Sequence, residues 1–143
     1  MKILVINGPN LNMLGIREPE IYGSSTLQDI YNMLQAEALD KCELKFFQSN
    51  HEGAIVDEIQ AAYQKFDGIL INPAAYTHTS LAIADAIKAV GIPVVEVHIS
   101  DISAREEFRQ ISYIKPFAIA QISGLGIQGY VVGLQKLIEH IQK

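Results

Sequence analysis

The chain has 143 residues, 49% of them apolar and 19% charged, which is typical of one globular domain spanning residues 1–143. Its net charge is −5 and it contains no basic block, which argues against nucleic acid as a partner. Cys42 is the single cysteine and no apolar run approaches the ~18 residues of a membrane span, so we expect no internal disulfide, no membrane insertion and a reducing, cytoplasmic setting.

Strand-like and helix-like stretches alternate along the chain. Short apolar runs predict strands, and apolar residues recurring at helical spacing predict helices. In chain order we expect a strand at 3–6, a helix at 27–41, a strand at 43–48, a helix running to residue 66, a strand at 69–71, a helix at 81–90, a strand at 93–97, a short helix at 104–111, a strand at 117–122 and a helix at 127–142. Residues 7–23 are expected to be an irregular loop, which at that length usually serves as a lid or binding loop.

Capping residues mark the ends of these helices. The Ser-Thr pair at 25–26 predicts the start of the first helix, and the Ser-Asn pair at 49–50 predicts the start of the second. Gly91 predicts the end of the third helix. Ser103 and Glu106 have the spacing of a capping box, which predicts the short fourth helix.

The strands are short and mostly apolar on both faces, as strands are when helices cover both sides of a parallel sheet. The second strand is more polar, which favours an edge position. We therefore predict an α/β fold with a doubly wound five-stranded parallel sheet in the order 2-1-3-4-5. In such a sheet, ligands bind beyond the carboxyl ends of the strands, where the strand order reverses between strands one and three.

Polar residues collect in the loops that leave strands one, three and four. They are Asn10, Arg17, Tyr22, Asn72, His78, His98 and Ser100. Three separate stretches thus bring seven polar groups to one edge of the sheet, which favours a small-molecule site. The alternative is that these residues are turn formers and helix caps, as polar residues at strand ends often are.

Taken singly, the candidates also have structural interpretations. Tyr22 could pack in the core or lie on the surface, and Arg17 could pair with a neighbouring glutamate. His98 ends a buried strand and could be a core histidine with satisfied polar atoms. Asp85 lies inside an Ala- and Ile-rich helix and could face an interface or the solvent. No cluster of His, Cys, Asp and Glu has metal-ligand spacing, so we expect no metal.

Two further motifs are ambiguous. Arg105 and Arg109 are four positions apart on the predicted short helix and could bind an anion or pair with Glu106. The glycine pattern at 124–129 matches G-x-G-x-x-G, but a dinucleotide site would open the first βαβ unit and be followed by another strand. We therefore interpret these glycines as a tight turn, a helix entry and a close helix-to-sheet contact.

Five longer motifs occur in order between residue 3 and about residue 138. They are N-G-P-N-L-N-M-L-G-I-R-E-P-E-I-Y-G, I-N-P-A-A-Y-T-H-T-S, E-V-H-I-S, R-E-E-F-R and G-L-G-I-Q-G-Y. Together they closely resemble type II 3-dehydroquinate dehydratase. The resemblance implies a flavodoxin-like fold and a cytoplasmic lyase that dehydrates 3-dehydroquinate to 3-dehydroshikimate in the shikimate pathway, which leads to aromatic amino acids. It also implies no metal or organic cofactor, and trimers that assemble into a homododecamer.

The resemblance also assigns the chemical steps. Tyr22 matches the base that removes the C2 proton, and Arg17 matches the arginine that makes this phenol a usable base. Ionising an ordinary tyrosine at pH 7 costs about 4 kcal/mol, and an adjacent guanidinium lowers such a pKa by roughly 1–3 units. Asn10 matches the residue that holds a water against the enolate oxygen at C3. His98, oriented by Glu96, matches the acid that protonates the departing C1 hydroxyl.

Other matches are to substrate contacts. They are Asn72, His78, Ile99, Ser100 and Arg109, with Asp85 supplied by a neighbouring subunit. The chain departs from the family pattern at Asp101, where many relatives carry Asn. A negative charge there would weaken binding of a carboxylate near Ser100, unless Asp101 turns away or caps the following helix.

Two other functions stay open on the sequence. A non-catalytic flavodoxin-like module could hold a flavin or a nucleotide at the same edge, although Pro9 removes an N–H where a phosphate cradle needs donors. An inactive family member kept as a scaffold is a third possibility, and the complete set of polar residues argues against it.

Overall fold

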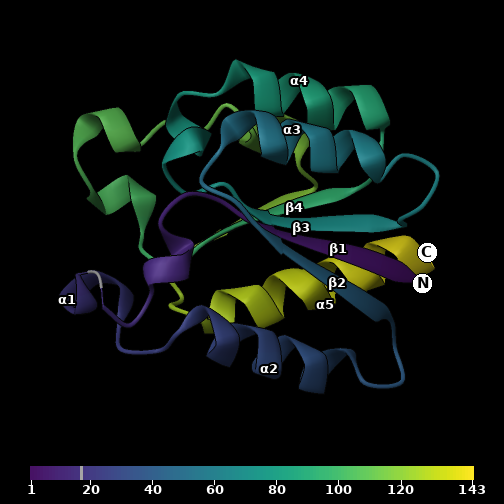
Figure 1. Ribbon diagram of the computed structural model, residues 1–143, viewed down its shortest axis with the longest axis horizontal. Coiled ribbons are helices and arrows are strands. Elements are labelled where there is room, and N and C mark those ends of the chain that lie inside the picture. The colour runs from purple at the N-terminus through teal and green to yellow at the C-terminus, as the bar shows by residue number, and fades with distance from the viewer. Residues whose placement is uncertain (17) are drawn as a thin grey trace.

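The computed structural model describes residues 1–16 and 18–143, and the side chain of Tyr22 lies outside this description. Five parallel strands form one sheet in the order β2-β1-β3-β4-β5 (Figure 1). They are β1 Lys2–Asn7, β2 Glu43–Gln48, β3 Gly68–Asn72, β4 Val94–His98 and β5 Ala120–Ser123. The predicted fold class and strand order are confirmed, with the more polar β2 at an edge.

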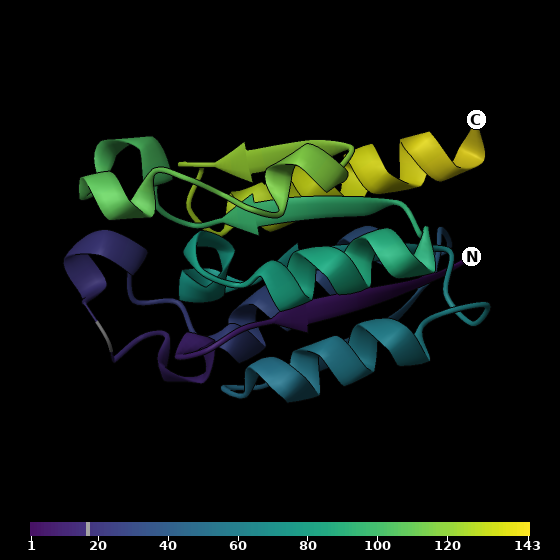
Figure 2. The ribbon, with the colours of Figure 1, turned by 90° about the horizontal axis from the view of Figure 1, so that it is seen from above.

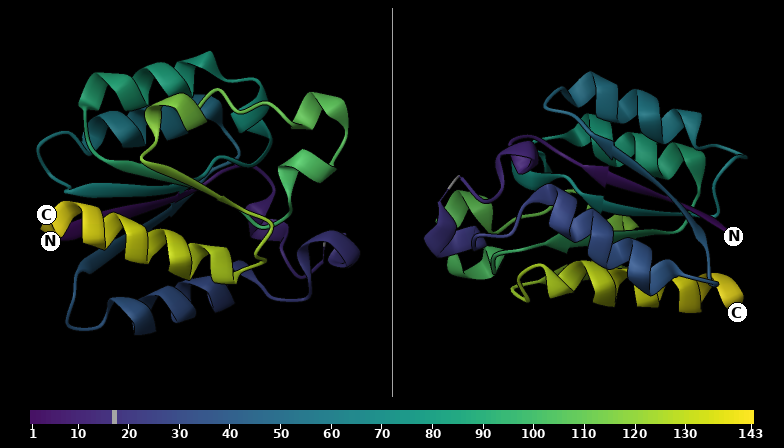
Figure 3. Two further views of the ribbon diagram at one scale, coloured as in Figure 1. Left: turned by 180° about the vertical axis from the view of Figure 1, so that it is seen from behind. Right: turned by 60° about the horizontal axis from the view of Figure 1, so that its bottom comes forward.

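Helices cover both faces of the sheet (Figures 1 and 3). α2 (Leu27–Ala38) and α5 (Gln128–Gln142) pack on one face, and α3 (Glu52–Ala61) and α4 (Leu81–Val90) pack on the other. The four-residue helix α1 (Pro19–Tyr22) lies away from both layers, beyond the carboxyl edge of the sheet. Within residues 1–16 and 18–143, none of the helices has the length and apolar character needed to cross a membrane.

The central strands send alternate side chains into two cores. Ile3 and Val5 of β1 pack with α2 and α5, while Leu4 and Ile6 pack with α3 and α4, and all four are fully buried. Burying one such side chain stabilises the fold by about 1.5–3 kcal/mol. A wholly apolar run is therefore what a strand covered on both faces requires.

Because the strands are parallel, their carboxyl ends meet at one edge of the sheet (Figure 2). Asn7 at the end of β1 pairs with Gln48 of β2 and with Asn72 of β3. His98 at the end of β4 pairs with Ser123 of β5. Both chain termini lie at the opposite edge. The loops that leave β1, β3 and β4 thus start side by side.

The predicted ends of two helices agree with the structure. Thr26 caps α2 through a capping box, in which its Oγ1 accepts from Asp29 N (3.1 Å) and Asp29 Oδ2 accepts from Thr26 N (2.9 Å). α2 ends earlier than predicted, at Ala38. Gly91 ends α4 in the left-handed conformation, with a φ of 66°.

The predicted cap of α3 is wrong. Its N-cap is His51, which makes no side-chain capping bond, and the helix ends at Ala61 rather than near residue 66. The two predicted caps accept other bonds: Ser49 Oγ accepts from His51 N (3.0 Å) and Asn50 Oδ1 accepts from Asn10 N (3.0 Å). Asn50 is thereby used to hold the loop after β1.

The short helix predicted after β4 is also wrong, because two 3₁₀ turns, Ile102–Ala104 and Glu107–Arg109, occupy this segment. Arg105 between them is extended, with a ψ of −172°, which interrupts any helix. Asp101 provides the cap, since its Oδ1 accepts from Ser103 N (3.0 Å) and from Ser103 Oγ (2.6 Å). Ser103 is therefore engaged with Asp101 instead of opening a capping box.

Two other boundaries differ from prediction. The strand expected at 117–122 begins only at Ala120, because Lys115–Phe117 forms a 3₁₀ turn with a proline in its first turn. Residues 7–23 are not irregular throughout, since they contain the 3₁₀ turn Leu11–Met13 and helix α1.

The first two glycines of the glycine-rich motif have the turn-forming role inferred for them. Gly124 and Gly126 have φ values of 82° and 62°, which shape the turn into the helix. A Cβ on Gly129 would lie 3.4 Å from Ile122 Cγ2, an ordinary contact distance, so the close approach of α5 to the sheet does not require this glycine. It requires Gly133, where a Cβ would lie 2.8 Å from Val97 Cγ2.

Candidate active site

A cleft opens at the carboxyl edge of the sheet, between the loops that leave β1, β3 and β4. It is narrow in this structure and encloses a volume of about 40 Å³. Its lining residues are Pro9, Asn10, Leu11, Asn72, Ala74, Ala75, His78, His98, Ile99, Ser100, Ile102, Arg105 and Arg109. Five of the seven polar residues predicted to converge here line this cleft. The other two predictions, Arg17 and the Tyr22 side chain, lie outside the described residues.

One wall of the cleft depends on Gly8. Its N–H donates to the Asn72 carbonyl (2.8 Å), which ties the loop after β1 to the loop after β3. A Cβ at this position would lie 2.5 Å from the Pro73 carbonyl oxygen, so only glycine allows the two loops to cross. The crossing places Asn10 at the mouth, exposed and left-handed with a φ of 70°, and Asn50 holds its backbone N–H.

Asn72 is held at the base of the cleft by a buried chain of hydrogen bonds. Its Oδ1 accepts from Ala74 N (3.0 Å), and its Nδ2 donates to the Tyr130 hydroxyl (2.8 Å). Tyr130 in turn donates to Asn7 Oδ1 (2.7 Å). Burial raises the pKa of Tyr130 far above its usual range, so its hydroxyl keeps the proton that this chain needs. These bonds fix which way the Asn72 amide faces.

His78 extends from the turn after β3. Its Nδ1 lies 2.7 Å from the Ile111 carbonyl oxygen, which can only accept, so Nδ1 carries a proton. Partial burial lowers the pKa of His78 below its usual 6.5. The positive charges of His98 and Arg109 lower it further, while the hydrogen bond to the Ile111 carbonyl and the charge of Glu96 raise it by less. His78 therefore favours the neutral form, and its Nε2 is then a hydrogen-bond acceptor.

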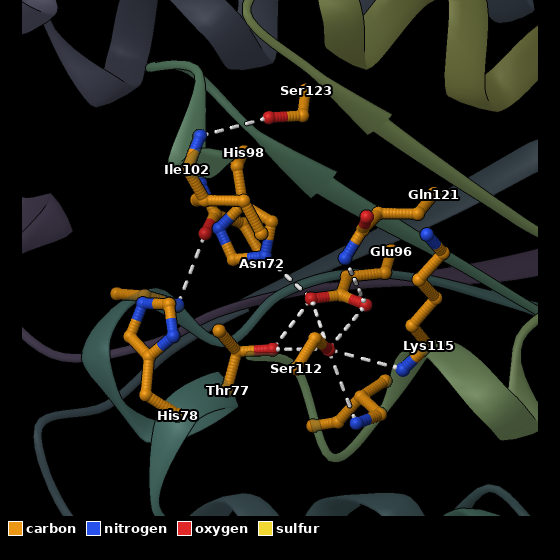
Figure 4. A network of polar contacts seen from close by, with 12 residues as sticks. Asn72, Thr77, His78, Glu96, His98, Ile102, Ser112, Lys115, Gln121 and Ser123 are labelled. Atoms are coloured by element: carbon orange, nitrogen blue, oxygen red, sulfur yellow. Dashed lines mark hydrogen bonds and ion pairs between the residues drawn. The ribbon is translucent and has the colours of Figure 1, made fainter. Parts of the chain in front are cut away.

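His98 and Glu96 form a buried pair on β4 (Figure 4). Glu96 is 0% exposed and His98 is 5% exposed, and His98 Nε2 lies within hydrogen-bonding distance of Glu96 Oε2. Burial alone would raise the pKa of Glu96, but the hydrogen bond and charge of His98, with the hydroxyls of Thr77 and Ser112, outweigh it and hold this pKa below its usual 4.5. An ionised Glu96 thus orients the His98 ring.

Two arginines line the cleft from the segment that was predicted to be a helix. Arg109 Nε lies 2.9 Å from Glu106 Oε2, as one predicted alternative required, and its guanidinium stacks on Phe108. Its Nε is buried and forms no hydrogen bond to the described residues, so this contact is a charge pairing. Arg105 Nη1 reaches Ser100 Oγ at 3.5 Å. Arg105 was predicted only as an alternative anion-binding residue, from its four-residue spacing to Arg109, and both arginines line the cleft.

Two residues singled out in the sequence do not line the cleft of this chain. Asp85 is exposed on α4 and is not among the residues that line the cleft of this chain. Asp101 turns away: its carboxylate caps the turn that follows and lines a separate hollow with Ser100 and Arg105. The conflict expected between Asp101 and a bound carboxylate is therefore reduced by this cap.

The cleft combines positive and amide groups with one buried carboxylate behind its wall. Two arginines and two histidines face a space in which Glu96 is held back beneath His98, an arrangement suited to a small anion. Among residues 1–16 and 18–143, no group of three or more His, Cys, Asp and Glu side chains could hold a metal ion. The groups present can donate hydrogen bonds and move a proton at His98.

Comparison with known proteins shows the family. The family model described as "Dehydroquinase class II" matches residues 1–138. The chain belongs to the class II dehydroquinase family. A 3-dehydroquinate dehydratase of Geotalea daltonii is 61% identical over 144 residues, covering 100% of both chains. Another, from Acaryochloris marina, is 61% identical over 142 residues, covering 98% of this chain and 95% of its own.

Solved class II dehydroquinases have the same fold. The crystal structure of the type II dehydroquinase from Butyrivibrio crossotus superposes with a TM-score of 0.93 at 53% identity, covering 96% of this chain and 97% of that one. The type II dehydroquinase from Propionibacterium acnes gives 0.92 at 40% identity, with 96% of each chain covered. The match extends over the strands and helices that carry the cleft.

Proposed function

We propose that this chain is a 3-dehydroquinate dehydratase that forms 3-dehydroshikimate in the cytoplasm, in the shikimate pathway. The buried His98–Glu96 pair at the end of a cleft rich in arginines and amides is the observation that carries the proposal. A dehydration needs a base for the C2 proton and an acid for the C1 hydroxyl. The family and the 61% identity to a 3-dehydroquinate dehydratase supply the substrate.

In the proposed mechanism, the Tyr22 phenolate removes the C2 proton, and Arg17 favours that phenolate by its charge. Both roles rest on the sequence motif, since both side chains lie outside the described residues. Removing the C2 proton makes an enolate whose oxygen, at C3, is stabilised by a water that Asn10 holds at the mouth of the cleft.

His98 completes the reaction. Protonated His98 donates to the C1 hydroxyl, the C1–O bond breaks with its electron pair moving to oxygen, and the enolate electrons form the C1–C2 double bond as water leaves. Glu96 stabilises the charge on His98 before this transfer. The proton that Tyr22 took from C2 then returns to solvent, and His98 regains one.

The proposed substrate contacts use residues that line the cleft. In this proposal the backbone of Ile99 and the Ser100 hydroxyl receive the substrate carboxylate, and Arg109 receives its hydroxyls. Asn72 and His78 supply further hydrogen bonds from the base of the cleft. Asp85 would reach the substrate of a neighbouring subunit. The proposal therefore includes a trimer, and four such trimers would form a homododecamer.

The experiment that tests the proposal mixes the purified protein with 3-dehydroquinate in the presence of EDTA and follows the absorbance of the enone product. We expect turnover that EDTA does not slow, because the proposed steps use side chains alone. A protein that forms no product, or that is yellow or releases a nucleotide on denaturation, would instead support a flavin- or nucleotide-binding module.

The role of Tyr22 is tested in the same assay. Tyr22→Phe removes the ionisable hydroxyl and keeps the ring, so we expect kcat to fall by about 10²–10⁴-fold, the contribution of a positioned base. Arg17→Ala should lose turnover as well, since the tyrosine then returns toward its ordinary pKa. Circular dichroism checks that both variants stay folded. A Tyr22→Phe variant that keeps most of its rate would remove this residue as the base.

A further inference from the structure

Glu96 is surrounded by side chains that the family comparison did not assign. Thr77 Oγ1 lies within hydrogen-bonding distance of Oε2, Ser112 Oγ lies 2.9 Å from both oxygens, and Gln121 Nε2 donates to Oε1 at 3.1 Å. These three residues come from the turn after β3, from the loop before β5 and from β5 itself (Figure 4). With His98, four side chains from separate segments converge on one buried carboxylate.

Counting hydrogens fixes the roles of these groups. Ser112 Oγ accepts from the backbone N–H groups of Ile114 (3.2 Å) and Lys115 (3.0 Å), so its single hydrogen is available to donate toward Glu96. The Gln121 amide nitrogen can only donate, and the Thr77 hydroxyl contributes another hydrogen to Oε2. Glu96 thus accepts from Thr77, Ser112 and Gln121, and an ionised Glu96 has no hydrogen to donate to its remaining partner, His98.

The hydrogen bonds to Glu96 determine which nitrogen of His98 carries the hydrogen. Since Glu96 is ionised and only accepts, the Nε2 that faces it must carry a hydrogen. The neutral ring is then the Nε2–H tautomer, and Nδ1 is the nitrogen that Glu96 does not engage. His98 lines the cleft, so Nδ1 is the atom available to a bound substrate.

We infer that Ser112 is a positioning residue that, together with Thr77 and Gln121, keeps Glu96 a hydrogen-bond acceptor. As a result, Nδ1 of His98 is the atom that donates a proton to the leaving hydroxyl. The inference rests on the proposed function for the identity of the leaving group. In this step the Nδ1–H bond breaks, its proton joins the departing oxygen as the C1–O bond breaks, and His98 is left neutral with its hydrogen on Nε2.

The loop that carries Ser112 is itself fixed to the site. Tyr113 N donates to the Thr77 carbonyl (2.9 Å), which joins the Ser112 loop to the turn after β3. The titratable groups that face Glu96 are His98 on the same strand and His78 from that turn, with Arg109 beyond His78. The His78 and His98 rings are stacked with centroids 6.3 Å apart. A change in the Ser112 hydroxyl therefore acts on Glu96 first and on the histidines through it.

Two variants remove donors to Glu96 in different ways. Ser112→Ala removes one donor and also leaves two backbone N–H groups without their acceptor. Thr77→Val replaces the hydroxyl with a methyl group of nearly the same shape, and so removes a donor to Glu96 and the contact with Ser112 Oγ (2.9 Å). We expect each to lower kcat by about tenfold or more, a part of the 10²–10⁴ that a general acid contributes, with KM nearly unchanged. Ser112→Thr keeps the hydroxyl and should restore most of the rate.

The pH profile separates positioning from a loss of stability. With fewer donors, Glu96 takes up a proton at higher pH, so the acid limb of the kcat profile should move to higher pH in both variants. Ser80→Ala is the matched control, because Ser80 Oγ accepts from Ile83 N to cap α4 and makes no hydrogen bond to Glu96. It should destabilise the fold without moving the profile.

Nitrogen-15 NMR of His98 in the ligand-free protein tests the inference without any substrate. We expect neutral His98 to carry its proton on Nε2 in the wild type and to show a mixture of tautomers in Ser112→Ala. A wild-type tautomer protonated on Nδ1, or variants with an unmoved acid limb, would overturn the inference. A wild type with the Nε2–H tautomer but no turnover would overturn the proposed function alone.

Discussion

The cleft has a floor and a rim that are built in opposite ways. The floor consists of Asn72, Glu96 and His98, which are at most 5% exposed and are held by hydrogen bonds from neighbouring segments. The rim consists of Asn10, Arg105 and Arg109 on irregular segments, where the main ion pair of Arg109 is with an exposed Glu106. Buried networks impose one geometry, while exposed ion pairs contribute only about 0–1 kcal/mol. Under the proposed function, proton transfer belongs to the fixed floor, and binding of the substrate hydroxyls by Arg109 belongs to the adjustable rim.

Removing His98 should have the largest effect on this division. In His98→Ala we expect kcat to fall by about 10²–10⁴-fold, because the acid is lost, while KM changes little. Steady-state kinetics measure this, and far-ultraviolet circular dichroism checks the fold. A variant that keeps wild-type kcat would place the acid elsewhere, and the floor would then have no catalytic role.

Tyr130→Phe tests the part of the floor beneath Asn72. It removes a buried hydroxyl and leaves Asn7 Oδ1 and Asn72 Nδ2 without their partner, which costs about 1–3 kcal/mol for each unpaired group. Urea unfolding measures the loss, and KM should rise because the Asn72 amide can then turn. Tyr63→Phe is the control, since Tyr63 is 52% exposed and its change should stay within about 0.5 kcal/mol.

The pH dependence of stability tests whether Glu96 is a buried carboxylate. Its pKa is lowered in the folded state, so it contributes stability that is present above pH 4.5 and is lost as the pH falls through its folded pKa. The wild type should therefore be more stable than Glu96→Gln at neutral pH, and the difference should shrink below pH 4.5. An equal difference at both pH values, measured by urea unfolding, would contradict an ionised Glu96.

The smallest effect is expected at the rim. Glu106→Gln removes the carboxylate that competes with the substrate hydroxyls for Arg109, so KM should fall by about 1.4–5-fold, the size of an exposed ion pair worth about 0.2–1 kcal/mol. Unfolding free energy should hardly change. Arg109→Ala should raise KM instead, and a fall in both variants would show that Arg109 does not bind the substrate.

The strands of the sheet could be predicted because burial on both faces leaves a pattern in consecutive residues. Ile3, Leu4, Val5 and Ile6 are all fully buried, so a strand covered on both faces leaves an unbroken apolar run in the sequence. The more polar β2 likewise indicated an edge. Helix α4 was bounded correctly by Gly91, whose left-handed conformation is a local requirement.

The rim could not be predicted in the same way. The segment R-E-E-F-R has good helix formers, but Asp101 binds Ser103 and Arg105 is extended, so two short turns replace the helix. Contacts with other segments also hold this stretch, such as the bond from Ile102 N to Ser123 Oγ of β5 (3.2 Å). Local propensity does not contain such contacts.

The partners of Glu96 were also beyond sequence reasoning. The side chains that donate to Glu96 follow no periodicity in the sequence, because each is placed by its own contact with the buried carboxylate. They are Thr77, Ser112 and Gln121. The only signal was Glu96 itself, a charge inside an apolar strand that requires partners. The resemblance supplied His98 as one partner, and the structure supplies the others.

A crystal structure with a substrate-like cyclic carboxylate bound tests the central claim most directly, because it shows whether floor and rim act on one ligand. We predict the carboxylate at Ile99 and Ser100, Arg109 at the ring hydroxyls, and Nδ1 of His98 within hydrogen-bonding distance of the oxygen at C1. A ligand bound outside this cleft, or one that meets His98 only through Nε2 with Glu96 displaced, would contradict the account.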